Sequence, residues 1–249
     1  LVATLNMRLD TPRLLVDING IAGLDRIDLD DGEVVIGALV RHAQAMRSET
    51  IATHAPLVAR ALPHIAHPAI RNRGTICGSI GYGAPAARLA ACLVALGGSV
   101  EIIGPSGGRR VAADRFFGGL FETALEPGEI VTAGRLPAAN GSRRYGFAEL
   151  ARRRGDYALV GLAAVAEADG DTLRGTHLVY VGVGATPVRA REAEAALDAQ
   201  GFAGLADAVA AVTRELAPED DVHASAATKR HLAGVLLRRV AAEMQDPWA

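Results

Sequence analysis

The sequence predicts an α+β fold whose second unit is a small antiparallel sheet with helices on one face. Three observations lead to this prediction. Short apolar runs end at turn-forming residues, which is typical of strands. Apolar residues recur at helical spacing in residues 56–65. Residues 137–142 are rich in turn formers, and they divide the chain into two units.

In the first unit, short apolar runs predict strands, and apolar residues at helical spacing predict helices. The strands are expected at residues 13–19, 33–39, 99–103, 109–113 and 129–136, with the third and fourth joined as a hairpin. Helices are expected at residues 41–49, 56–65 and 86–96. Four apolar side chains, most of them phenylalanines, are expected in the core: Phe116, Phe117, Leu120 and Phe121.

In the second unit, the apolar runs 157–168 and 173–183 flank an Asp-Gly-Asp turn and predict a second hairpin. Three helices are expected after it, at about residues 188–199, 205–216 and 225–244. In the last of them Leu232, Val235, Leu236, Val240 and Met244 share one face. These helices are expected to pack as a second layer on one face of the antiparallel sheet.

Composition excludes several classes of protein. Half of the residues are apolar, so the chain is globular rather than disordered. The formal net charge of -2 offers no basic surface for nucleic acid. Charges or glycines interrupt every apolar run before it reaches the ~20 residues of a membrane span. Cys77 and Cys92 make no disulfide framework, which fits a reducing cytoplasm.

No Ser/His/Asp arrangement stands out by its spacing, so no catalytic residue is assigned. His54, His64 and His67 lie close together, but no carboxylate or cysteine completes a ligand set and prolines interrupt the spacing. No metal site is therefore predicted, and solvated or capping histidines are expected instead.

Residues 69–87 form the most distinctive stretch, with four glycines and with hydroxyls at Thr75 and Ser79. Glycine lets the backbone approach a ligand closely, and successive N–H groups in such a turn form an anion-binding concavity suited to a pyrophosphate. The helix expected just afterwards adds positive charge at its start. The alternative is a glycine-rich surface loop that only turns the chain, since neither a Walker loop nor a good Rossmann fingerprint is present.

Residues 71–79, with Pro85-Ala86-Ala87 after them, resemble the second flavin loop of the FAD-binding medium subunits of molybdenum hydroxylases, the carbon monoxide dehydrogenase and xanthine dehydrogenase family. The likeness continues in order along nearly the whole chain. It covers residues 15–19, 36–39, 116–130, 136–137, 151–160, 182–189, 221–225 and 230–232.

The resemblance implies a two-subdomain PCMH-type FAD-binding domain over residues 1–138 and a C-terminal domain over residues 143–249. Residues 1–9 match only the segment just after the family's first flavin loop, so a preceding piece of the protein is expected. FAD is the implied cofactor. The molybdopterin cofactor and the [2Fe-2S] clusters would belong to partner chains, a large and a small subunit, in a cytoplasmic hetero-oligomer.

The resemblance also implies particular contacts with FAD. Thr75, Ile76, Cys77, Gly78 and Ser79 would wrap the pyrophosphate and the adjoining ribityl chain. Ile130 and Val131 would touch the adenine side, and Tyr157, after Gly155-Asp156, would lie against the isoalloxazine ring. The alternative for Tyr157 is an ordinary half-buried tyrosine at the start of a strand.

Five residues depart from the family pattern at this site, and among them Tyr82 and Gly83 replace a frequent His-Ala pair. Cys77 replaces a glycine, Ala84 replaces an aspartate that hydrogen-bonds the flavin nucleotide, and Arg88 replaces an acidic residue. One lost charge-assisted hydrogen bond costs ~1.5–3 kcal/mol, and a side chain at Cys77 requires φ < 0 or local strain. Arg88 could restore an anion contact from another direction.

The resemblance leaves three functions open. The first is an electron-transfer flavoprotein subunit, which takes electrons from a [2Fe-2S] partner and passes them to a quinone, NAD or dioxygen. The second is a degenerate flavin domain that serves as a scaffold and binds FAD weakly or not at all, which Cys77 and Ala84 favour. The third, a stand-alone oxidase of the vanillyl-alcohol-oxidase type, lacks a substrate-domain insertion and a flavin-linking motif.

Overall fold

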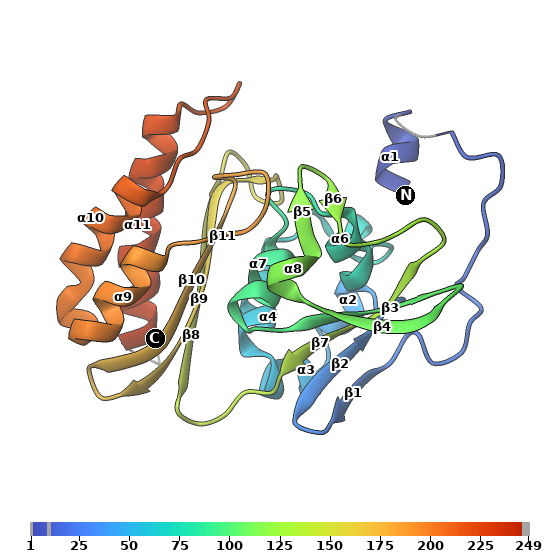
Figure 1. Ribbon diagram of the computed structural model, residues 1–249, viewed down its shortest axis with the longest axis horizontal. Coiled ribbons are helices and arrows are strands. Elements are labelled where there is room, and N and C mark those ends of the chain that lie inside the picture. The colour runs from blue at the N-terminus through green and yellow to red at the C-terminus, as the bar shows by residue number, and fades with distance from the viewer. Residues whose placement is uncertain (1, 9–10, 246–249) are drawn as a thin grey trace.

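Two antiparallel sheets organise the chain in the computed structural model, which describes residues 2–8 and 11–245 (Figure 1). The larger sheet has five strands in the order β1-β2-β7-β3-β4, with bounds β1 Ile27–Asp30, β2 Glu33–Gly37, β7 Ile130–Pro137, β3 Ser99–Gly104 and β4 Gly107–Ala112. The smaller sheet has four strands in the order β11-β10-β9-β8, with bounds β11 Val188–Arg189, β10 Thr172–Val181, β9 Ala158–Asp169 and β8 Arg143–Ala151. A separate pair joins β5 Phe117–Gly119 to β6 Glu122–Thr123.

Short helices connect the strands of the larger sheet. They are α1 Val2–Asn6, α2 His42–Ala45, α3 Glu49–His54, α4 Pro56–Ala61, the 3-10 turn η1 Leu62–His64, α5 Pro68–Arg71, α6 Ile76–Tyr82, α7 Arg88–Ala95 and α8 Ala113–Phe116. After the smaller sheet come α9 Arg191–Gln200, the 3-10 turn η2 Gly201–Gly204, α10 Leu205–Glu215 and α11 Ala226–Gln245.

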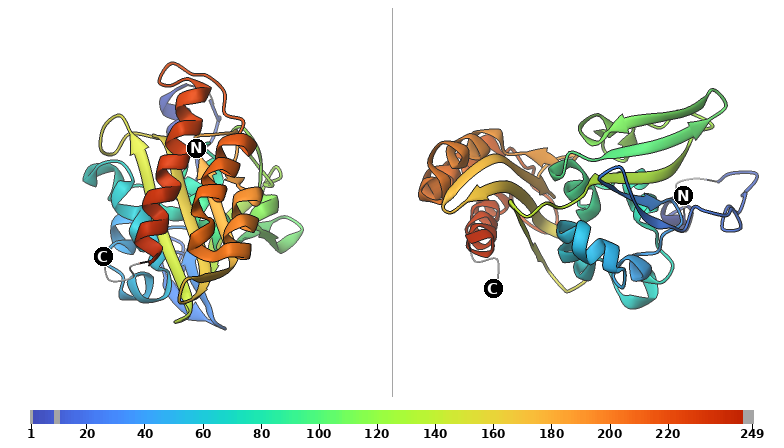
Figure 2. Two further views of the ribbon diagram at one scale, coloured as in Figure 1. Left: turned by 90° about the vertical axis from the view of Figure 1, so that its left-hand side faces the viewer. Right: turned by 90° about the horizontal axis from the view of Figure 1, so that it is seen from below.

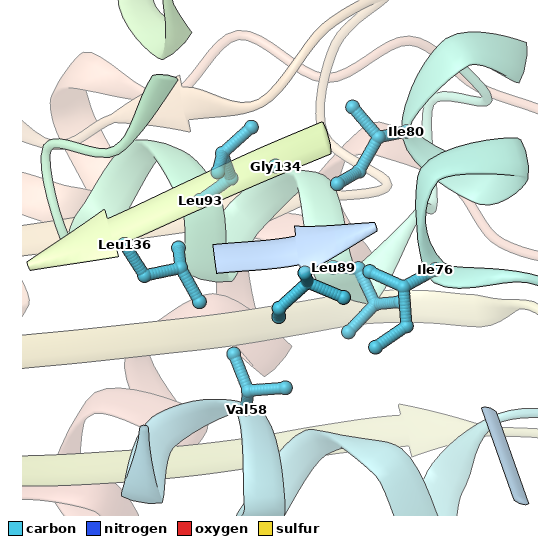
Figure 3. Close-up of a pocket in the computed structure, with 8 residues that line it drawn as sticks. Val58, Ile76, Ile80, Leu89, Leu93, Gly134 and Leu136 are labelled. Atoms are coloured by element: carbon cyan, nitrogen blue, oxygen red, sulfur yellow. The ribbon is translucent and has the colours of Figure 1, made fainter. Parts of the chain in front are cut away.

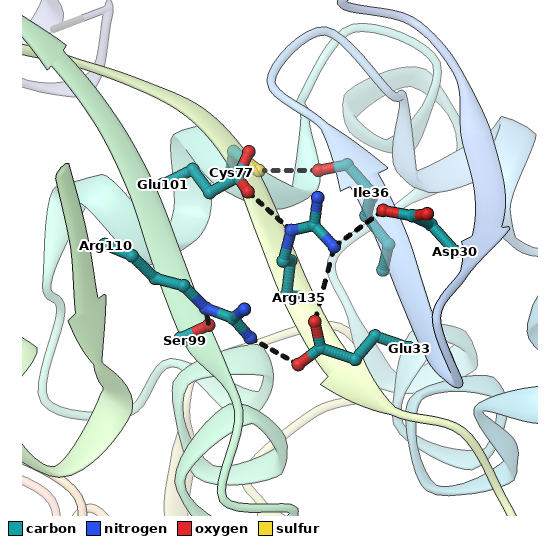
Figure 4. Close-up of polar contacts among 8 residues, drawn as sticks. All are labelled: Asp30, Glu33, Ile36, Cys77, Ser99, Glu101, Arg110 and Arg135. Carbon is teal, nitrogen blue, oxygen red and sulfur yellow. Dashed lines mark hydrogen bonds and ion pairs between the residues drawn. The ribbon is translucent and has the colours of Figure 1, made fainter. Parts of the chain in front are cut away.

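The larger sheet is apolar on one face and charged on the other. On the apolar face, side chains of β7, α4, α6 and α7 converge on a small interior cavity (Figure 3). On the opposite face Arg135 forms ion pairs with Asp30, Glu33 and Glu101, and Arg110 also binds Glu33 (Figure 4). The helices therefore cover one face, and an ion-pair network ties the strands together on the other.

The smaller sheet is buried on both faces. Residues alternate between the two sides of each strand, so each strand contributes side chains to two cores. Phe147 and Val165 join the core shared with α4 and α7, whereas Leu162 and Leu178 join the core built by α9, α10 and α11. Figure 1 shows those three helices along the outer side of β8–β10, and Figure 2 shows α11 running along the same sheet. The sequence-based prediction of helices on one face is right for the unit's own helices; α4 and α7 cover the other face.

Most predicted elements are present, with shifted ends. The two predicted hairpins are β3–β4 and β9–β10. The helix predicted at residues 41–49 ends at Ala45, and α3 begins at Glu49. Of the segments discussed from the sequence, residues 1, 9 and 246–249 lie outside the described residues.

The strand predicted at residues 13–19 is wrong. This segment is irregular, and Leu14, Leu15 and Val16 are 77%, 58% and 75% exposed. A strand needs a neighbour with which to pair, and β1, the edge of the sheet, pairs only with β2 among the described strands.

The expectation that four apolar residues near β5 lie in the core is half right. Phe116 is fully buried and Phe117 packs against the core. Leu120 and Phe121 are 59% and 50% exposed, because they lie in the turn between β5 and β6, where Phe121 has φ +58°.

Within the described residues, one stretch, Arg191–Glu215, is long and apolar enough to cross a membrane by length and composition. In the structure it is broken into α9, η2 and α10, which pack against β10 and α11. A core helix pair explains this composition.

Candidate cofactor-binding site

The glycine-rich stretch folds into helix α6, not into the open turn that the sequence suggests. Thr75 is its N-cap, and the Thr75 hydroxyl accepts a hydrogen bond from the N–H of Gly78 at 3.0 Å. The helix ends at Gly83, whose φ of +61° is the left-handed conformation that glycine adopts easily.

The first turn of α6 uses its N–H groups in different ways. The N–H of Ile76 donates to the carbonyl oxygen of Val40 at 3.0 Å, so it anchors the helix to the chain after β2. The N–H of Cys77, one residue further on, has no acceptor four residues earlier within the helix. The donors that this turn can offer a ligand are therefore the Cys77 N–H and, as a shared hydrogen bond, the Gly78 N–H.

The start of α6 also leaves hydroxyls at the surface. Thr75 and Ser79 are half-buried and Gly78 is exposed. A Cβ at Gly78 would lie 2.6 Å from the Thr75 hydroxyl oxygen. Glycine at this position therefore keeps the main chain exposed and leaves the Thr75 capping hydrogen bond undisturbed. The combination of hydroxyls, exposed main chain and the positive end of a helix suits an anion.

Ile76 and Cys77 direct their side chains inward. Ile76 points into the apolar cavity between β7 and α7, as Figure 3 shows. The Cys77 thiol is buried and lies 3.4 Å from the carbonyl oxygen of Ile36 in β2 (Figure 4). Because the side chain faces the core and Cys77 has ordinary helical geometry, it introduces neither the backbone strain expected from the sequence nor bulk on the outer face.

Burial raises the pKa of the Cys77 thiol to about 12, although a hydrogen bond from the Gly134 backbone opposes the rise. Burial raises the pKa of Cys92 as well. Both thiols are therefore protonated and inert at neutral pH. Cys77 acts as a small apolar side chain at the contact between α6 and the larger sheet.

His42 lies behind the start of α6 and was not singled out by the sequence. It is 5% exposed, and neither ring nitrogen makes a hydrogen bond of normal geometry among the described residues. A Cβ at Gly74 would lie 3.1 Å from the His42 Nδ1 atom, so the ring packs directly against the backbone that leads into Thr75. Burial, and then the charge of Arg71, lowers the pKa of His42 to about 4, so the ring is neutral.

Ile130 and Val131 begin strand β7. Ile130 pairs with Ile103 and is 42% exposed, whereas Val131 packs partly into the core. A Cβ at Gly81 would lie 3.7 Å from Val131, so the start of β7 contacts α6 directly. Ile130 thus offers an exposed apolar side chain at the start of β7.

Asp156 and Tyr157 end the connection between β8 and β9. Both are exposed, and the Tyr157 side chain is 64% exposed rather than half-buried. Burial raises the pKa of Tyr82, and the phenol of Tyr157 acts in the same direction. The Tyr82 ring itself lies 4.9 Å from that of Phe121.

Two departures from the family pattern have a clear structural outcome. Ala84 is buried with Ala87 and Ala90. Arg88 does not replace the lost carboxylate as an anion contact, because its guanidinium is 6% exposed and forms a bidentate pair with Glu149, at 2.6 Å and 2.9 Å. This pair was not predicted, since its partners are far apart in the sequence.

Across residues 2–8 and 11–245, no group of three or more His, Cys, Asp or Glu side chains could hold a metal ion. His64 lies 3.5 Å from Glu149 and packs on Phe147 with ring centroids 5.2 Å apart.

Two family models together match nearly the whole chain. Residues 1–139 match the FAD binding domain in molybdopterin dehydrogenase, and residues 145–244 match the CO dehydrogenase flavoprotein C-terminal domain.

Known proteins of high similarity are subunits of dehydrogenase complexes. The chain is 35% identical to the 6-hydroxypseudooxynicotine dehydrogenase complex subunit alpha of Paenarthrobacter nicotinovorans, over 98% of this chain and 83% of the relative. It is also 35% identical to the carbon monoxide dehydrogenase medium chain of Afipia carboxidovorans, over 96% of this chain and 84% of the relative.

Solved structures agree. A carbon monoxide dehydrogenase of Hydrogenophaga pseudoflava gives a TM-score of 0.93 at 33% identity, covering 98% of this chain and 85% of that one. Quinoline 2-oxidoreductase of Pseudomonas putida 86 gives 0.91 at 31% identity, covering 98% and 86%.

The fold and the site thus define a flavoprotein subunit of an oxidoreductase. The chain belongs to the family of FAD-binding medium subunits of molybdenum hydroxylases, which includes the carbon monoxide dehydrogenase medium chains. FAD is the cofactor of this family, and the molybdenum and iron–sulfur centres belong to other subunits. The donors at the start of α6 suit a diphosphate, and the exposed ring of Tyr157 offers an aromatic surface, so both fit such a cofactor.

Proposed function

We propose that this chain is the FAD-binding electron-transfer subunit of a molybdopterin-dependent dehydrogenase or hydroxylase. It takes electrons from a small [2Fe-2S] subunit and delivers them to an external acceptor, while a large molybdopterin subunit oxidises the substrate. The observation that carries the proposal is the start of α6, where the Thr75 cap, bare Gly78 and half-buried Ser79 present donors at one surface.

Each residue at the start of α6 has a defined role in the proposed site. Thr75 and Ser79 would donate hydroxyl hydrogen bonds to the pyrophosphate, and Cys77 and Gly78 would donate main-chain N–H groups. Ile76 would act as an anchor, because its N–H is taken by Val40 and its side chain is buried. Bound FAD supplies the redox chemistry, and the protein supplies its position and electrostatic surroundings.

The remaining proposed contacts come from β7 and from the connection between β8 and β9. Ile130 and Val131 would form the apolar surface for the adenine side. Tyr157 would lie against the isoalloxazine ring, and its exposure leaves one ring face free for stacking. Asp156 would act through its main chain, which fixes the start of β9.

We further propose that residues 1–138 and 143–249 are the two domains and that the hetero-oligomer is cytoplasmic. The first family model ends at residue 139 and the second begins at residue 145, which supports the division. Two free cysteines, both buried, are consistent with a reducing compartment.

The alternative is a scaffold subunit with weak or no FAD binding. Ala84 favours it, because a buried alanine replaces the carboxylate of the resembling family. Cys77 does not, because its thiol faces the core. The two functions differ in one measurable property, the affinity for FAD.

The test is a fluorescence titration of the full polypeptide with FAD. We expect saturable binding that Gly78→Ala weakens at least about tenfold, since the added Cβ collides with the Thr75 hydroxyl. Gly141→Ala is the control, because no atom lies within 4 Å of its Cβ position. Absence of saturable binding would support the scaffold, and equal affinity of both variants would remove the first turn of α6 from the site.

A further inference from the structure

Arg88 joins three segments that are far apart in the sequence. It opens helix α7, its guanidinium binds both carboxylate oxygens of Glu149 near the end of β8, and its Nη2 atom also donates to the carbonyl oxygen of Asp156. Both charged side chains are 6% exposed. A buried, bidentate pair of this kind has one defined geometry.

The third contact lies next to Tyr157. The carbonyl of Asp156 belongs to the peptide group that joins Asp156 to Tyr157. The hydrogen bond from Arg88 therefore fixes the orientation of this peptide plane, which the Tyr157 backbone follows. The N–H of Asp156 donates to the carbonyl oxygen of Arg153 at 3.1 Å and closes the turn on its other side. Because the Tyr157 side chain is 64% exposed, packing does little to orient it, and the backbone decides where it points.

The other end of the turn, at Gly155, packs against Ala66 and His67 of the first unit. Gly155 has φ +88°, and a Cβ there would lie 2.8 Å from the carbonyl oxygen of Ala66. Arg71 donates to that same carbonyl oxygen at 2.9 Å. The turn therefore lies close against Ala66 at one end and is hydrogen-bonded by Arg88 at the other.

Glu149 keeps Arg88 in place. Burial acts to raise the pKa of Glu149, but hydrogen bonds from His64 and Arg88 outweigh it, so the pKa lies below its ordinary value and the carboxylate is charged. Lysine cannot reproduce this arrangement, because a single ammonium group does not match two carboxylate oxygens and a carbonyl together.

We infer that Arg88 is a positioning residue, which sets the orientation of Tyr157 toward the isoalloxazine ring through the carbonyl of Asp156. The inference rests on the proposed contact between Tyr157 and the flavin. An ionised acidic side chain at residue 88 could not donate to Asp156, so this chain holds the turn by a contact that the resembling family's usual residue cannot make.

The first experiment needs no cofactor. Amide hydrogen exchange of residues 154–158 is measured in the full polypeptide without FAD, for the wild type, Arg88→Lys and the double variant Arg88→Met/Glu149→Leu. We expect exchange at least about tenfold faster in both variants. The double variant leaves no unpaired charge in the buried site, so it separates loss of the Asp156 contact from general destabilisation.

Arg189→Lys is the matched control. Arg189 also forms a bidentate pair, with Glu194 at 2.9 Å and 2.6 Å, but it lies on β11, away from the turn. We expect exchange of residues 154–158 to stay within about twofold of the wild type in this variant. Equal exchange in Arg88→Lys and the wild type would overturn the inference, and Arg88→Lys still decides the question if the double variant does not fold.

The second experiment tests the step to the cofactor. Tyr157→Ala is expected to raise the fluorescence of bound FAD in the wild-type background and to add nothing in the Arg88→Lys background, as for two residues that act through one contact. An equal increase in both backgrounds would contradict the inference. If the wild type binds no FAD, the proposed function fails, whereas the exchange experiment still decides the role of Arg88.

Discussion

At the residue scale, the direction of each side chain decides what the site can do. Cys77 looks like a defect in a glycine-rich cofactor loop, but its thiol is buried against the Ile36 carbonyl. The motif could locate Thr75 and Ser79, since their hydroxyls carry the pattern. It could not show which way Cys77 points, because that depends on α6 being a helix.

Restoring the family glycine should therefore cost stability without improving binding. For Cys77→Gly we expect a loss of about 2 kcal/mol in the free energy of unfolding, from lost packing and from lower helix propensity. We expect FAD affinity to stay within about threefold of the wild type. Denaturant unfolding and a fluorescence titration measure the two quantities, and a large gain in affinity would show that the thiol obstructs the cofactor.

His42 should make stability depend on pH. Its pKa is lowered from 6.5 to about 4 in the folded protein, so the unfolded chain takes up the proton first as pH falls. The contribution of neutral His42 to the free energy of unfolding is fully present above about pH 6.5, and about 2 kcal/mol is lost between pH 7 and pH 5.

Urea unfolding of FAD-free protein at pH 7 and pH 5 measures this effect. In His42→Leu the difference between the two pH values should shrink by about 2 kcal/mol, because leucine does not titrate. Leucine also fills most of the buried volume of the ring, and neither His42 nitrogen makes a hydrogen bond of normal geometry among the described residues. An unchanged difference would mean that other groups cause the pH dependence.

At the element scale, the least expected feature is α6. Glycines at residues 74, 78, 81 and 83 suggested an open turn, yet Thr75 caps a seven-residue helix and Gly83 ends it. Propensity missed the helix because packing of Ile76 and Ile80 into the core outweighs the cost of glycine. The opposite error occurred at residues 13–19, where an apolar run lacks a strand with which to pair.

Thr75, the N-cap of α6, should contribute both to the stability of the protein and to its affinity for FAD. Thr75→Ala removes the hydroxyl that accepts from Gly78, so we expect a loss of about 1 kcal/mol in stability. We expect FAD affinity to fall about tenfold, since the same hydroxyl is a proposed donor. Thr75→Ser keeps the hydroxyl and should behave like the wild type; equal binding by both variants would assign Thr75 a structural part only.

At the scale of the whole molecule, the smaller sheet is shared between the two units. Strand patterns in the sequence predicted the hairpin β9–β10 but gave no information on what covers its second face. That face is closed by α4 and α7, and the buried pair of Arg88 with Glu149 crosses the same boundary. Contacts of this kind join residues that are distant along the chain, so local patterns do not report them.

Loss of this shared packing should weaken both units together. Phe147 is 6% exposed on the face toward α4, so Phe147→Ala should cost about 3 kcal/mol. Hydrogen exchange should then speed up in β2 and β7 as well as in α10 and α11. Faster exchange confined to the C-terminal helices would show that the two units unfold independently.

The central claim is that the start of α6 binds the diphosphate of FAD through its hydroxyls and main-chain donors. Its most direct test is an amide NMR titration of the full polypeptide with FAD. The account predicts saturable shifts in the amide signals of Cys77, Gly78 and Ser79, together with that of Tyr157. Saturable binding that leaves the amides of residues 77–79 unmoved, or no binding at all, would contradict it.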